Sequence, residues 1–224
     1  MATRETTSTP GDRARDRGLA RTLKALILVW FLVVLAAGSR GLFVAGPSQP
    51  PLPLLAAVVG PPAVFALVHA GSRRFRDFVL GLDLRVLTAV QAWRVLGAVF
   101  LALYAFRLLP GLFAWPAGLG DAGVGVAAVF VLRAILVGAP NWPRRVWWLN
   151  VAGLLDFVGA LGTGVLTSNT TLGLLASGAP RADLGALPLS LIPTFAVPLW
   201  AIAHLISLLQ LRREKNRIGG VAPV

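Results

Sequence analysis

Ionisable and amide side chains that interrupt long apolar runs are the residues of this chain that could do chemistry. Four of them fall at similar predicted depths in the cytoplasmic half of the membrane: Gln91, Arg94, Asp156 and His204. A charged side chain at the centre of a membrane helix costs about 2.5–3.5 kcal/mol, even on the lenient insertion scale. We therefore predict that these side chains face inward and form a polar pocket that opens to the cytoplasm and binds a small ligand or ion.

Asp156 carries the sharpest signal, because small residues surround it at helical spacings of three, four, seven and eight. These are Ala152, Gly153, Gly159, Ala160, Thr163 and Gly164. Such a face favours close contact between helices, so the carboxylate is expected to point into the bundle, towards Arg94 or Arg133. Two interpretations stay open: a structural ion pair that locks two helices, and a proton- or cation-coupled site.

Other polar residues have simpler interpretations. His69 and His204, on different predicted helices, could ligate a b-type haem, although packed or interfacial histidines are the alternative. Beyond that alternative the residues indicate no cofactor and no metal, since a metal site needs more ligands. Asp121 is predicted to cap the amino end of the fourth span. Arg133 is predicted to extend towards the inner interface.

Composition places the chain in a membrane. It has 224 residues, of which 56% are hydrophobic and 13% charged, with a mean hydropathy of +0.75. A soluble domain could not hide so much apolar surface. The net charge of +12 would suggest nucleic acid in a soluble protein. Here the basic residues lie between apolar runs, so the expected partners are membrane lipids and not nucleic acid.

The apolar runs predict an all-α, polytopic transmembrane helix bundle over residues 23–211, with both termini cytoplasmic. The six spans are expected at about 23–44, 52–70, 86–109, 122–139, 146–166 and 187–211. Residues 1–22 are predicted to be a disordered basic cytoplasmic tail, and 212–224 a second basic tail. Whether the first span is retained or cleaved as a signal peptide stays open.

The basic residues set the predicted orientation. With both ends inside, 16 of the 21 basic residues lie in cytoplasmic segments, three in outer segments and two within spans. That asymmetry is the positive-inside bias of membrane proteins, and it depends on having six spans.

Several stretches from the third span onward resemble a family of small bacterial multi-pass membrane proteins with no assigned activity. They include Trp115-Pro116-Ala117-Gly118-Leu119-Gly120-Asp121 and Leu154-Leu155-Asp156-Phe157. Further resemblance lies in residues 84–94, 188–193 and 197–199. The resemblance implies the bacterial inner membrane and supplies no catalytic residues.

Three classes of function follow. The leading hypothesis is binding or transport of a small ligand or ion by the pocket. The second is an accessory or scaffold subunit, in which the polar groups only lock helices and which has a protein partner or forms a homo-oligomer. The third is a membrane-embedded enzyme, with Asp156 and His204 as acid–base candidates, or a haem protein; no catalytic motif supports an enzyme. Asp156→Asn separates the first two, because it should abolish activity under the first and mainly reduce stability under the second.

Overall fold

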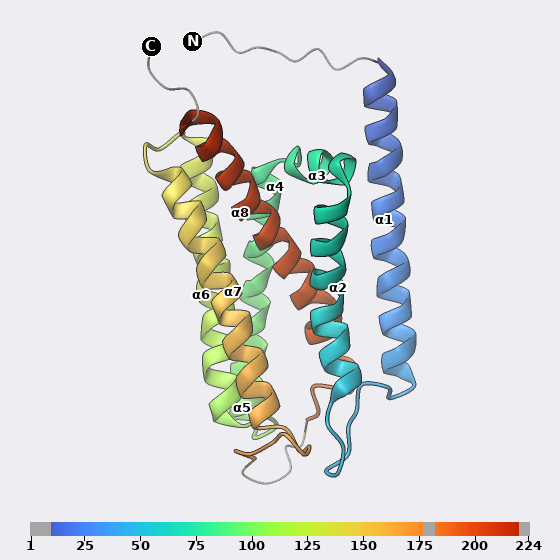
Figure 1. The fold of residues 1–224 in the computed structure, drawn as a ribbon. Coiled ribbons are helices and arrows are strands. Elements are labelled where there is room, and N and C mark those ends of the chain that lie inside the picture. Colours follow the sequence, from blue (N-terminus) through green and yellow to red (C-terminus); the bar gives the residue numbers. More distant parts are fainter. Residues whose placement is uncertain (1–9, 177–181, 220–224) are drawn as a thin grey trace.

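The protein is a bundle of helices in a computed structural model that describes residues 10–176 and 182–219. Six helical stretches are long and apolar enough to cross a membrane, as predicted. They are Gly18–Ser39, Leu52–Gly71, Leu84–Ala105, Gly111–Leu136, Trp142–Leu166 and Ile192–Asn216. They run alternately up and down, so α1 begins and α8 ends at the same end of the bundle (Figure 1). The chain is therefore a multi-pass membrane protein.

Helix α1 (Pro10–Ser39) stands at one side of the bundle, and its rings at Trp30 and Phe31 pack on Phe195 (Figure 1). It begins well before the predicted span, so residues 10–22, which we predicted as disordered, are helical; residues 1–9 lie outside the described chain. Arg, Ala and Leu in this segment are good helix formers. Extending a helix already nucleated by the apolar span avoids the cost of a new nucleus.

Helix α2 (Leu52–Gly71) packs against α8 (Val197–Gly219), and the short amphipathic α3 (Arg73–Leu80) lies across the end of the bundle near the chain termini (Figure 1). Ser72 caps α3, its hydroxyl accepting from the Phe75 amide at 3.2 Å. The rings of α3 turn inward onto Phe65 and Ile206.

The third span is divided into α4 (Leu84–Val90), the 3-10 segment η1 (Gln91–Ala98) and α5 (Val99–Ala105). A 3-10 helix is narrower than an α-helix, which lets a neighbouring helix approach closely. Helix α6 (Gly111–Leu136) does so at Gly125, where a Cβ atom would lie 2.5 Å from the backbone nitrogen of Val95. The divided span therefore holds its polar residues tightly against α6.

Helix α6 begins 11 residues earlier than the predicted fourth span, and the prediction that Asp121 caps its amino end is wrong. Asp121 lies in the interior of α6 and is buried. The predicted fourth span began only at residue 122 and left Gly118 and Gly120 outside the helix. These glycines serve packing instead, because a Cβ at Gly118 would lie 2.7 Å from Leu101. Small residues of this kind allow backbones to approach within a membrane.

Helix α7 (Trp142–Leu166) lies beside α6 and α8 (Figure 1). The last span begins with the π-helical segment η2 (Ile192–Ala196), which contains Pro193, and continues as α8 with Pro198 in its first turn. Proline lacks an N–H donor and disturbs the regular ladder, and a π-turn is one way of absorbing that disturbance.

Candidate functional site

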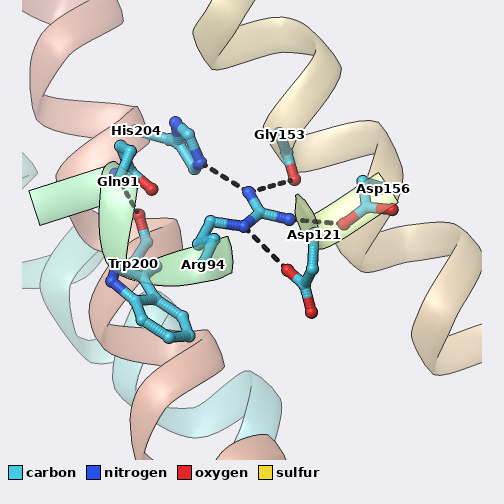
Figure 2. A network of polar contacts seen from close by, with 7 residues as sticks. All are labelled: Gln91, Arg94, Asp121, Gly153, Asp156, Trp200 and His204. Carbon is cyan, nitrogen blue, oxygen red and sulfur yellow. Dashed lines mark hydrogen bonds and ion pairs between the residues drawn. The ribbon is translucent and has the colours of Figure 1, made fainter. Parts of the chain in front are cut away.

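Arg94 is the centre of a polar network that joins four elements in the middle of the bundle (Figure 2). Its side chain is fully buried. Nε donates to Asp121 Oδ1 at 2.8 Å, and Nη2 forms an ion pair with Asp156 Oδ2. Nη1 lies 3.3 Å from the carbonyl oxygen of Gly153 and 3.0 Å from His204 Nε2. One guanidinium from η1 thus contacts α6, α7 and α8 together.

The contacts of His204 fix its protonation. Both hydrogens on Arg94 Nη1 point outward from the guanidinium, so Nε2 of His204 must accept one of them. The other ring nitrogen, Nδ1, then carries the proton and donates to Asn150 Oδ1 at 2.7 Å. The amide of Asn150 in turn donates to the Val146 carbonyl oxygen, also at 2.7 Å. The imidazole is therefore neutral and held in one tautomer by partners at both nitrogens.

Three glycines leave the space that the network occupies. A Cβ atom at Gly97 would overlap Asp121, and one at Gly120 would overlap the carboxylate of Asp156. A Cβ at Gly153 would overlap the imidazole and lie 2.8 Å from the guanidinium Nη1. The helices can close around these charges only because the three positions carry no side chain.

The charge balance of the network is uneven. Two carboxylates face one guanidinium, and His204 is neutral, so the ionised network has one net negative charge. Phe157 covers the guanidinium, with the ring centroid 3.9 Å from Arg94 Cζ, which adds a cation–π contact. An unbalanced charge in a low-dielectric interior favours binding of a positive partner, such as a proton or another cation.

A cavity of about 190 Å³ reaches the network from one end of the bundle. Asp121 and Phe157 line its inner part, and loop residues line its outer part, among them Ser168 and Asp183. These loops lie at the end opposite the start of α1 and the end of α8 (Figure 1). The predicted pocket opened on the side of the chain ends and was lined by Gln91, Arg94, Asp156 and His204. None of these four residues lines this cavity, which opens at the other end. Asp121, the residue whose position was misjudged, is the one that connects the cavity to the network.

The structure brings together three of the four predicted site residues, Arg94, Asp156 and His204, and Arg94 is the predicted partner of Asp156. Gln91 is buried beside them but donates to the Trp200 carbonyl oxygen at 3.5 Å (Figure 2). Arg133, the other candidate partner, is exposed on α6. That these residues bind a ligand stays a prediction.

Asp121 is the functional candidate that the sequence analysis missed. The signal was available, because Gly118, Gly125 and Ala128 share its helical face at spacings of three, four and seven. The same pattern of small residues drew attention to Asp156. Because the glycines were interpreted as helix breakers, the buried position of Asp121 on this helical face was not predicted.

The haem alternative finds no support in the contacts of His204. Both of its ring nitrogens are engaged, by Arg94 and Asn150, so iron ligation would have to break one of these bonds. His69 packs against Phe65 near the end of α2. Among residues 10–176 and 182–219, no three histidine, aspartate or glutamate side chains gather as a metal site would need.

Fold and site together define a multi-pass membrane protein with a buried polar network of two carboxylates, one guanidinium and one imidazole. Residues 51–212 match the family described as Domain of unknown function (DUF8737), and the chain belongs to that family. Over 104 residues the chain is also 33% identical to the fluoride-specific ion channel FluC of Bordetella petrii, covering 43% of this chain and 77% of the channel. No solved structure matches.

Proposed function

We propose that this protein, a multi-pass protein of the bacterial inner membrane, transports a small cation, and that the Arg94 network is the binding point on the pathway. The observation that supports this most is the composition of the cavity. Of its lining residues in the described chain, the charged ones are Asp121 and Asp183, both acidic, in a protein whose net charge is +12. An acidic lining raises the local concentration of cations and repels anions.

The two carboxylates of the network have different expected roles. Asp121 lines the cavity, and only its Oδ1 pairs with Arg94, so Oδ2 can accept an entering cation. Asp156 does not line the cavity and stays paired with the guanidinium. An entering cation would compete with Arg94 for Asp121, while Asp156, Gly153 and His204 keep the guanidinium in place. The network can therefore bind and release a cation at Asp121 while the guanidinium of Arg94 stays in position.

A second candidate is fluoride conduction, which the similarity to the FluC channel favours. Under that proposal the guanidinium of Arg94 would be the anion-binding group. Asp121 lies at 2.8 Å from it and competes for the same positive charge. The balance of charge around the cavity therefore makes the cation the leading candidate.

Ion flux through reconstituted liposomes tests both candidates. Vesicles containing the purified protein are loaded with a gradient of protons, sodium, potassium, a small organic ammonium or fluoride. Its decay is followed with ion-selective dyes or an electrode, or with a radiolabel for the organic ammonium. We expect a cation gradient to decay faster than in empty vesicles and the fluoride gradient to persist. Rapid decay of the fluoride gradient alone would replace the leading proposal with the second.

Asp121→Asn and Asp156→Asn connect the flux to the network. Both keep the shape of the side chain and remove its charge, and each is expected to reduce flux to the rate of empty vesicles. Asp77→Asn is the matched control, because the Asp77 side chain is 70% exposed and forms a surface ion pair with Arg213 at 3.6 Å, far from the network. If the folded network variants transport as the wild type does, or if no ion moves through the wild type, the accessory role of the protein takes precedence.

A further inference from the structure

The side chains that line the cavity describe a ligand. Most of the wall is apolar and partly aromatic, and it includes Val58, Phe100, Leu109, Phe113, Phe157 and Ile192. The charged lining residues in the described chain are Asp121, in the interior of α6, and Asp183, in the loop before η2. A hydrated inorganic ion would gain little from such a wall, since hard cations need several oxygen ligands.

We infer that this cavity binds a small organic cation with an apolar body, such as an aryl- or alkylammonium of about eight non-hydrogen atoms. The size follows from the volume of about 190 Å³, because an apolar protein cavity of about 150 Å³ holds one benzene molecule. As an identification of the transported species, the inference rests on the proposed function. As a binding site, it is tested without any transport.

The position of the charge in the ligand follows from the acidic inner end. An ammonium group near Asp121 can donate to Oδ2, the oxygen that does not pair with Arg94. The rings of Phe100 and Phe113 lie edge to face with centroids 5.1 Å apart and offer the apolar body an aromatic wall. At the mouth, Asp183 adds a second negative charge on the route inward.

The site is tested by isothermal titration of the full-length protein in detergent with two matched probes. One is 2-phenylethylammonium, and the other is 2-phenylethanol, which has the same shape and a hydrogen-bond donor but no charge. A hydrogen bond to a charged group predicts that the cation binds about tenfold or more tightly than the alcohol. Equal affinity for the two probes would overturn the inference and would indicate a neutral occupant, such as part of a lipid chain.

Variants locate the binding. Ala160→Phe fills the cavity and is expected to abolish binding of the cation. Asp121→Asn should reduce the preference for the cation. Asp183→Asn should weaken binding of the cation and not of the alcohol. The last variant lies in an exposed loop, so it reports even if the two helix variants fail to fold.

Asp77→Asn is the control expected to bind like the wild type. Unchanged binding of the cation in both Ala160→Phe and Asp183→Asn would place the probe elsewhere and refute the site. Binding with the expected preference but no ion flux would sustain the site and remove the proposed transport. Flux of an inorganic cation without probe binding would sustain the proposed transport and refute the organic-cation site.

Discussion

Replacing Arg94 by methionine should destabilise the protein strongly, because within the described chain its guanidinium is the only positive group that pairs with the two carboxylates. Methionine keeps much of the length of the side chain and removes every polar contact. Breaking a buried ion pair by removing one partner costs about 3–5 kcal/mol, since the remaining charge is left uncompensated. We expect a loss of that size in the free energy of unfolding of Arg94→Met.

The loss of stability in Arg94→Met arises because two buried carboxylates are left without a positive partner. Removing the charge of both carboxylates as well should therefore restore stability. A triple variant, Arg94→Met with Asp121→Asn and Asp156→Asn, leaves no buried charge in the network. Replacing a buried ion triad by hydrophobic residues of similar volume is often neutral or stabilising. The asparagines keep polar amides but remove the uncompensated charge, which is the larger cost. The triple variant is therefore expected to recover most of the stability that the single variant loses, while it lacks transport.

Equilibrium unfolding in mixed detergent micelles, followed by circular dichroism, measures these differences. Arg133→Met is the matched control, because Arg133 is exposed on α6, and its effect should stay within about 0.5 kcal/mol. The reasoning is refuted if Arg94→Met is as stable as that control, or if the triple variant is as unstable as the single one.

Two further predictions concern the geometry around the network. Gly120→Ala should lower the free energy of unfolding by about 1–3 kcal/mol, because the added methyl overlaps Asp156. Gly123→Ala, one turn along α6 in open space, should be neutral or stabilising by up to about 1 kcal/mol. Thermal unfolding in detergent compares the two variants, and equal effects would contradict the close packing. His204 should show a neutral ring protonated at Nδ1 in histidine-selective nitrogen NMR. Asn150→Leu should keep this tautomer, because Arg94 still donates to Nε2, whereas Arg94→Met should release it. A protonated imidazolium in the wild type would contradict the charge balance.

Much of the fold could be predicted from the sequence, because membrane spans depend on runs of apolar residues whose lengths are set by the bilayer. All six spans were expected, and so was the contact between Arg94 and Asp156. The periodic small residues around Asp156 indicated which face of α7 meets the bundle. Burying a charge then requires a partner, and few were available.

The missed features depend on three-dimensional packing that the sequence pattern leaves ambiguous. Glycine serves both in loops and where helices touch, and only the neighbouring Leu101 and Asp156 show that Gly118 and Gly120 do the latter. The start of α6 was misplaced for this reason, and Asp121 with it. Which end of the bundle the cavity faces also depends on how loops far apart in the chain come together, which periodicity does not encode.

The most direct test of the account is whether blocking the cavity stops the flux. The chain has no cysteine, so Ala160→Cys places a single thiol in the cavity wall, and Leu174→Cys places one on a loop position that is 80% exposed and does not line the cavity. Each variant is labelled in detergent with a positively charged thiosulfonate reagent, checked for complete modification by mass spectrometry, and reconstituted for flux. The account predicts that labelling reduces flux to the rate of empty vesicles in Ala160→Cys and leaves Leu174→Cys unchanged. Undiminished cation flux through fully labelled Ala160→Cys would contradict the cavity as the pathway.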